Sequence, residues 1–286
     1  MTTSLTDYRA VWNKKAVLRL IYDDIFERIA GEVVDGLTIE VGGGIGNLKE
    51  KITWLISSDI QFAPWLDLVV DAQKLPFSDD SVSNIVMLDV LHHIEFPALL
   101  FKEAGRVLRP GGRIVMVEPA ITFGSSLFFK MFHHEPVDMN ADPFAEGRPD
   151  RRRNPYESNQ AIPTLLATRE RERFHARFSD LQVMQTEWFS FLAYPLSGGF
   201  RPWSLVSEGV ARSLLRIESK LERRFGRLFG FRLLMVIEKK TDAGSERLLA
   251  SQTTDVEAPL SINLDRSNSR AGKDIEKRFQ RQSVFR

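Results

Sequence analysis

The sequence predicts an α/β fold built on a mainly parallel sheet with helices on both faces. Short apolar runs of strand length alternate with longer segments whose apolar residues recur at helical spacing. A glycine-rich turn follows the first of these runs, and acidic residues stand at the ends of the next three. Doubly wound α/β sheets bind ligands at the carboxyl ends of their strands, so we expect the functional site there.

The composition narrows the classes of function. The 286-residue chain is 43% hydrophobic and 27% charged, as expected of a globular protein. Its formal net charge of +1 offers no overall basic surface, so no nucleic-acid partner is expected. The absence of cysteine excludes disulfides, thiolate-bound metals and a cysteine nucleophile. No leader peptide or membrane-spanning run is recognised, and we expect a cytoplasmic protein.

The glycine-rich turn follows a predicted buried strand, Thr38 to Val41. Glycine tolerates positive φ and places no Cβ between the backbone and a ligand. A dinucleotide fingerprint, G-x-G-x-x-G, starting at Gly42 would need its third glycine at position 47, which is Asn47. The spacing therefore argues against a nucleotide-dependent oxidoreductase, which stays the weaker alternative.

Two further strands are predicted before residue 71. Residues 54–58 form the second strand and end at Asp59, whose carboxylate can accept two hydrogen bonds from ribose hydroxyls. Residues 68–70 form the third and lead into Asp71. The connection between the two acids is short and contains Pro64, so the helix usual at this place is expected to be stunted or absent.

The next segments continue the alternation. The fourth strand, 84–88, ends at Asp89, and residues 95–108 form an amphipathic helix. A fifth strand covers 114–117. Thus four predicted strands in order are followed by polar residues or glycines at their carboxyl ends.

Four motifs stand at these strand ends. They are Glu40-x-Gly42-x-Gly44-x-Gly46, Asp71-Ala72-Gln73-Lys74-Leu75-Pro76-Phe77, Asp89-Val90-Leu91-His92-His93, and Leu108-Arg109-Pro110-Gly111-Gly112 continuing to Glu118-Pro119. Together they resemble the motifs of class I S-adenosylmethionine (SAM)-dependent methyltransferases, in the branch that includes the ubiquinone and menaquinone C-methyltransferases. The resemblance covers roughly Thr38 to Pro119.

The resemblance implies a Rossmann-like sheet whose last two strands, 181–194 and 231–238, form an antiparallel hairpin with the seventh beside the fifth. The methyltransferase domain would span 1–240. Insertions at about 120–180 and 196–230 would form a helical cap over the substrate. Residues 241–286 are polar and aperiodic, and we expect them to be disordered.

SAM is the cofactor that the resemblance implies. In this family the acid of the first motif lies near the methionine end of SAM, and the acid of the second motif and the following N–H read the adenine. N-terminal aromatic residues such as Tyr8 and Trp12 would close over the pocket. The expected cofactor-binding residues are Glu40, Gly42, Gly44, Gly46, Asp59, Ile60, Asp71, Ala72 and Asp89.

Histidines and one glutamate are the catalytic candidates. The turn with His92 and His93 lies under the methyl group in similar enzymes, where a histidine serves as general base or the backbone lines the pocket. His134 and Glu135 lie in a second polar cluster, interpreted as substrate contacts or as a polar loop. Adjacent histidines cannot share a helix face as i, i+4 ligands do, so no metal is expected.

A long amphipathic helix is expected over residues 206–228, with a row of basic residues beside its apolar stripe. Such a helix is either solvated or lies on anionic lipid. Glu208, Glu218 and Glu222 interrupt the basic row and weaken the prediction of peripheral membrane contact. The basic residues are Arg212, Arg216, Lys220, Arg223, Arg224 and Arg227.

The predicted function is transfer of a methyl group from SAM to a small-molecule or lipid-like acceptor. A non-catalytic SAM-binding regulatory or scaffold protein is the alternative. The polar residues of the cap insertions favour the enzyme. The sequence specifies neither the methylated atom nor the oligomeric state.

Overall fold

The computed structural model describes residues 4–132, 135–150 and 152–241. The chain divides into two units, Met1–Asp242 and Ala243–Arg286, and the fold below is that of the first. Apart from Thr241, the predicted disordered tail lies outside the described residues, and that expectation stays a prediction. In the described part, no helix is both long and apolar enough to cross a membrane.

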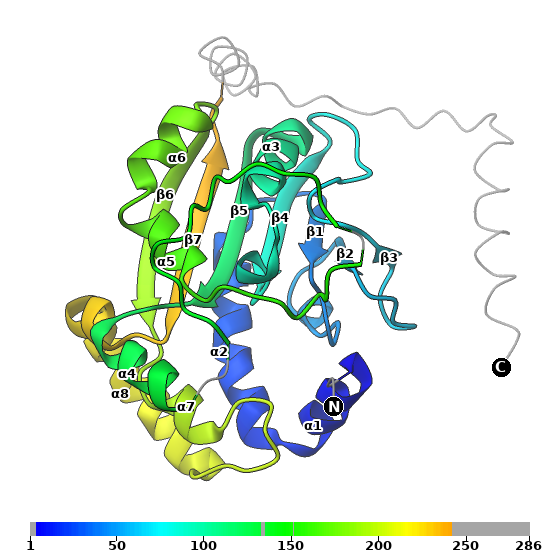
Figure 1. The fold of residues 1–286 in the computed structure, drawn as a ribbon. Coiled ribbons are helices and arrows are strands. Elements are labelled where there is room, and N and C mark those ends of the chain that lie inside the picture. Colours follow the sequence, from blue (N-terminus) through cyan, green and yellow to red (C-terminus); the bar gives the residue numbers. More distant parts are fainter. Residues whose placement is uncertain (1–3, 133–134, 151, 242–286) are drawn as a thin grey trace, which may run out of the picture. The chain divides into compact units, whose positions relative to one another are not determined.

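The described residues form a seven-stranded sheet of order β3-β2-β1-β4-β5-β7-β6 (Figure 1). Strands β1 to β5 pair in parallel, whereas β7 runs antiparallel to both β5 and β6. The predicted Rossmann-like fold with an antiparallel last strand is therefore confirmed. The strands are β1 (Thr38–Val41), β2 (Leu55–Asp59), β3 (Leu68–Val69), β4 (Val82–Leu88), β5 (Leu108–Pro119), β6 (Leu181–Phe189) and β7 (Arg232–Lys239).

The central strands are apolar on both sides because helices cover both faces of the sheet. Along β4, Ile85 and Met87 pack into one core, and Val86 between them packs into the other. The first core holds α3 (Pro97–Val107), α5 (Ile162–Ala167) and α6 (Arg171–Arg177). The second holds α2 (Ala16–Glu32), α7 (Ala193–Ser197) and part of α8 (Glu208–Phe229).

The remaining short elements lie toward the carboxyl ends of the parallel strands (Figure 1). They are α1 (Leu5–Lys14), α4 (Phe123–Phe132) and the 3₁₀ turn η2 (Leu91–His93). A second 3₁₀ turn, η1 (Leu48–Glu50), follows the glycine loop. As predicted, no helix occurs in residues 60–67, between β2 and β3.

Parts of the two predicted cap insertions cover the faces of the sheet instead of the substrate site. Within 120–180, Leu166 and Phe174 belong to the core on one face of the sheet, so α5 and α6 cover that face. Within 196–230, α8 packs on β6 and α2 on the opposite face. The sixth strand ends at Phe189 instead of Tyr194, because Ser190 takes a positive φ of 60° and turns the chain into α7. Among the described residues, α4 and the connecting loops are left as candidates for the predicted cap, which stays a prediction.

Candidate active site

The glycine loop after β1 is fastened to the end of β2. Gly43 N–H donates to Ser58 O at 2.7 Å, and Gly44 N–H donates to an Asp59 carboxylate oxygen at 3.1 Å. Gly42, Gly44 and Gly46 all have positive φ, of 69°, 47° and 75°. Side chains are strained in this region of φ, which explains the alternating glycines of the motif.

The glycines serve different purposes. A Cβ at Gly42 would lie 2.3 Å from Val90 Cγ2, so this glycine lets the loop pack against the turn after β4. A Cβ at Gly44 would meet nothing closer than Gly42 O at 3.9 Å. Gly44 therefore faces open space, as required of a loop whose backbone cradles a ligand.

Glu40 lies beneath this loop, with only 6% of its surface exposed. Its carboxylate accepts a hydrogen bond from Ser57 Oγ. Burial raises the pKa of Glu40 to about 7, although Ser57 and the charge of Lys49 act in the opposite direction. A buried carboxylate of this kind becomes fully charged when a cation is placed beside it.

The residues after β2 form a second side of the cradle. Asp59 accepts from Gly44 N–H and from Gln61 N–H, and burial raises the pKa of its carboxyl group. Beside it, Ile60 and Phe62 are 53% and 79% exposed. Such uncovered apolar side chains, next to the acid that is predicted to bind ribose, suit the faces of an adenine ring. Phe62 was missed because no motif includes it.

Asp71 and Ala72, the expected adenine contacts, follow β3. Asp71 Oδ1 accepts from Gln73 N–H at 2.9 Å, which fixes this turn, and Ala72 is buried. Both belong to the loop that follows β3, the neighbour of β2 in the sheet. Their role toward adenine stays a prediction.

Trp65, which the sequence did not single out, connects helix α1 to the glycine loop. Trp65 Nε1–H donates to Gly44 O at 2.8 Å, and the Arg9 guanidinium lies 4.3 Å from the centre of the Trp65 ring. Trp12 is buried, whereas Tyr8 packs edge-on against Phe200 at 5.1 Å. The structure thus brings α1 to the glycine loop.

Asp89, at the end of β4, has a positive φ of 59° and forms an ion pair with the buried Arg232 of β7. The guanidinium also stacks on the Tyr194 ring, 4.2 Å from its centre. Arg232 could not be recognised as part of the site, because 143 residues separate it from Asp89.

In the turn η2, His92 faces the carboxylate of Glu118, for which the sequence predicted no role. Glu118, fully buried at the end of β5, accepts from Val90 and Leu91 N–H with one oxygen. Its other oxygen lies 2.6 Å from His92 Nδ1. Burial alone would lower the pKa of His92, but the hydrogen bond and charge of Glu118, with Asp89 and Glu135, raise it.

His93 has the opposite character. Burial and the positive charge of His92 lower the pKa of His93. Its Nδ1 is 3.3 Å from Glu157 O, and because a carbonyl can only accept, Nδ1 carries the proton. A neutral His93 therefore has a lone pair on Nε2, which is what a general base requires.

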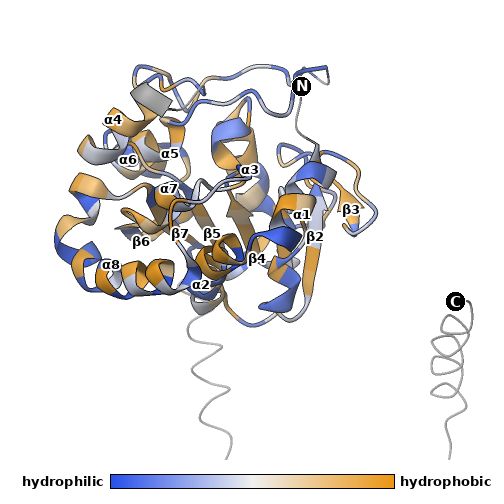
Figure 2. Ribbon diagram, turned by 90° about the horizontal axis from the view of Figure 1, so that it is seen from below, coloured by the Kyte–Doolittle hydropathy of each residue, from blue (hydrophilic) through white to orange (hydrophobic). Residues whose placement is uncertain are grey.

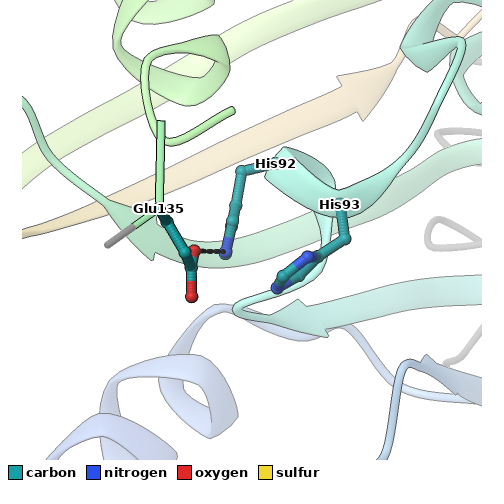
Figure 3. A group of neighbouring side chains, drawn as sticks. All are labelled: His92, His93 and Glu135. Carbon is teal, nitrogen blue, oxygen red and sulfur yellow. Dashed lines mark ion pairs between the residues drawn. The ribbon is translucent and has the colours of Figure 1, made fainter. Parts of the chain in front are cut away.

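Glu135 completes the group that includes His92 and His93 (Figure 3). Its carboxylate accepts from Ser158 Oγ at 2.9 Å and from Gln160, and lies 4.0 Å from His92 Nε2. The other member predicted for this cluster, His134, lies outside the described residues.

One ligand atom from each of His92, His93 and Glu135 lies within 4.8 Å of the other two. The prediction that no metal is bound stays a prediction, and these are the residues that would hold one.

Comparisons with known proteins agree with this arrangement. Residues 54–116 match a family model described as a methyltransferase domain. The chain is 39% identical over 56 residues to a demethylmenaquinone methyltransferase from Streptomyces avermitilis, over 19% of this chain and 24% of that protein. It is 49% identical over 49 residues to an uncharacterized 37.1 kDa transposon protein of Streptomyces fradiae, over 17% of this chain and 14% of that protein. These matches therefore span only a small part of the relatives' lengths.

Solved structures with a similar fold include a SAM-dependent methyltransferase from Thermotoga maritima, with a TM-score of 0.46 and 14% identity over 82% of this chain and 99% of that one. Another is the [4+2]-cyclase SpnF, with a TM-score of 0.45 and 15% identity over 77% and 82%. Neither likeness indicates a substrate. The methyltransferase-domain match over residues 54–116 and the local identity to a demethylmenaquinone methyltransferase agree with the observed sheet.

Proposed function

We propose that the protein transfers a methyl group from SAM to a small-molecule or lipid-like acceptor at the carboxyl ends of β1, β2 and β4. The observation that carries this proposal is the contact between Gly42 and Val90. It joins the glycine cradle directly to the turn that holds His92 and His93. Cofactor-binding and proton-accepting groups thus belong to one continuous site.

The residues present fit SAM. Gly44 leaves its side of the loop open, Glu40 supplies a buried acid beneath it, and Ile60 offers an uncovered apolar surface near Asp59. When bound, SAM supplies a methyl group attached to a positively charged sulfur. Glu40, Asp59, Asp71 and the glycine backbone would hold it, while the chain aligns the acceptor against it.

His93 is assigned the role of general base. Its neutral imidazole accepts the proton that an oxygen or nitrogen acceptor loses when it is methylated. Although burial opposes it, the hydrogen bond and charge of Glu118 raise the pKa of His92, and the charge of a protonated His92 lowers the pKa of His93. Neighbouring groups whose surroundings move their pKa values apart are typical of acid–base pairs. Glu135 lies beside both rings and would contact the acceptor.

Binding measurements test the cofactor assignment. Titration calorimetry of the purified protein with SAM and, in parallel, with NAD should show saturable binding of SAM only. NAD is the matched ligand because it shares the adenosine of SAM but needs the dinucleotide fingerprint that Asn47 breaks. Tighter binding of NAD than of SAM would refute the proposal.

A further inference from the structure

Helix α8 carries a row of exposed aliphatic side chains, here called the apolar stripe. Val210, Ile217, Leu221 and Leu228 are 48%, 54%, 39% and 51% exposed. They follow one another at intervals of seven, four and seven residues, close to whole turns of a helix with 3.6 residues per turn. The stripe therefore runs straight along α8 for about 27 Å, at 1.5 Å per residue.

Six basic side chains occupy the face of α8 next to the stripe. The inward face is marked by the buried Ala211, Glu218 and Gly226. By helical periodicity, the basic residues lie on the side turned away from these three. All six are exposed, and none forms an ion pair with a residue of the described ranges: Arg212, Arg216, Lys220, Arg223, Arg224 and Arg227.

The acids that weakened the prediction of membrane contact do not lie on this face. Glu218 is 3% exposed, and its carboxylate accepts from the backbone N–H groups of residues 191, 192 and 193 at the start of α7. Glu222 pairs with Arg28 of α2. Glu208 stands in the first turn, at the end of the helix. The outward face beyond that turn is therefore basic without interruption.

Helix α4 extends the apolar surface at the far end of α8. A Cβ at Gly124 would lie 3.0 Å from Phe229 Cδ1, so the start of α4 abuts the end of α8. Phe123 and Leu127 of α4 are 78% and 60% exposed. Figure 2 shows α4 beside the end of α8, where blue and orange alternate along the helix.

We propose that α8 and the start of α4 form a docking surface for an anionic lipid bilayer. Charge complementarity selects this occupant, because an uninterrupted basic face attracts acidic headgroups while the adjoining apolar stripe enters the boundary with the acyl chains. The stripe is a single row of side chains, which suits a planar surface. Helix α4 follows β5, whose end carries Glu118, so the docking surface adjoins the end of the sheet that holds the site.

Vesicle binding tests the proposal without requiring SAM or an acceptor. The full chain is sedimented with vesicles of phosphatidylcholine alone and with 30% phosphatidylglycerol added, at low and high salt. We expect binding to the anionic vesicles only, weakened by salt. K220Q/R227Q should lower the partition coefficient at least about tenfold, because two charges near the surface are lost. The control K74Q/K102Q removes two exposed charges from other elements and should bind like the wild type.

I217S/L228S tests the stripe and should bind anionic vesicles at least about fivefold more weakly, while its circular dichroism and thermal midpoint match those of the wild type. Light scattering of both proteins in solution distinguishes a different occupant. A wild-type dimer that becomes monomeric in I217S/L228S, with no vesicle binding, would assign the stripe to a second copy of the chain. Equal binding of neutral and anionic vesicles, or of K220Q/R227Q and the control, would also overturn the proposal.

Discussion

His92 and His93 are adjacent in the chain and their rings lie 4.1 Å apart, yet their surroundings move their pKa values in opposite directions. The difference comes from Glu118, which holds one ring and leaves the other to a backbone carbonyl. A motif with two histidines could not tell them apart. Their partners come from other parts of the chain, 26 residues away for His92 and 64 for His93.

Replacement of His93 by Gln should lower kcat by about 100-fold or more, because Gln cannot accept the acceptor's proton at neutral pH. In the wild type, kcat/KM should rise with pH through a pKa below 6.5 and then level off, because only the neutral imidazole is a base. Transfer of a tritiated methyl group into an extract containing acceptors measures both. His175→Gln, on α6, is the matched control. Full activity in His93→Gln would remove its assigned role.

The raised pKa of Glu40 leads us to expect that SAM affinity depends on pH. Its carboxyl group titrates at about 7 in the folded chain and at about 4.5 ordinarily. Its contribution to folding stability is therefore complete below about pH 4.5 and is lost as the pH rises through about 7. The ammonium group of SAM prefers the charged form, so affinity should fall by up to about tenfold per unit as the pH drops from 7 toward 5.5.

Calorimetry with SAM between pH 5.5 and 7.5 measures this slope. Glu40→Gln should bind weakly and with little dependence on pH. Glu50→Gln, an exposed position in η1, should keep the wild-type slope. A wild-type affinity that is flat over this interval would contradict a role for Glu40 toward the cofactor's cation.

At the scale of elements, the glycine loop combines a packing function with a binding function. Gly42 is needed for contact with Val90, whereas Gly44 is needed for the space beside it. Both share positive φ, so only the direction of the missing Cβ separates the two functions. The sequence predicted the motif, but that direction required the structure.

Gly44→Val should abolish detectable SAM binding, because a branched side chain would fill the cradle. Gly111→Val is the control, since Gly111 has a φ of 74° and its Cβ would meet Thr241 at an ordinary 3.6 Å. Both variants should lose about 1–3 kcal/mol of unfolding free energy through backbone strain. Calorimetry and thermal denaturation separate the effects. Equal loss of SAM binding in both would mean that strain, and not occupied space, is responsible.

Other elements illustrate what sequence patterns can and cannot predict. Pro64 and a short connection correctly predicted the missing helix before β3, because these are local constraints. The end of β6 was predicted too late, because the apolar residues 191–194 continue the strand pattern past the left-handed Ser190. Glu218 was counted among exposed charges, since periodicity alone could not anticipate its partners at the start of α7.

At the scale of the whole molecule, the mainly parallel sheet was predictable because successive strands carry recognisable ends, and the seventh strand beside the fifth followed from the resemblance. The acids Asp59 and Asp71 follow neighbouring strands of the sheet, as expected. Contacts that depend on the later strands were not predictable. Arg232 pairs with Asp89 because β7 lies beside β5, and no local sequence pattern predicts this ion pair.

The position of β7 has a consequence for synthesis on the ribosome. Within the sheet, β6 hydrogen-bonds to β7 alone, yet β6 emerges from the ribosome first. At about 5–20 residues per second, a nascent chain exposes β6 as an unpaired edge for roughly several seconds before β7 is made. Asp89 waits longer for Arg232, the first residue of β7, because 143 residues separate the two. The charge balance of the site is therefore completed by the last strand of the sheet to be translated.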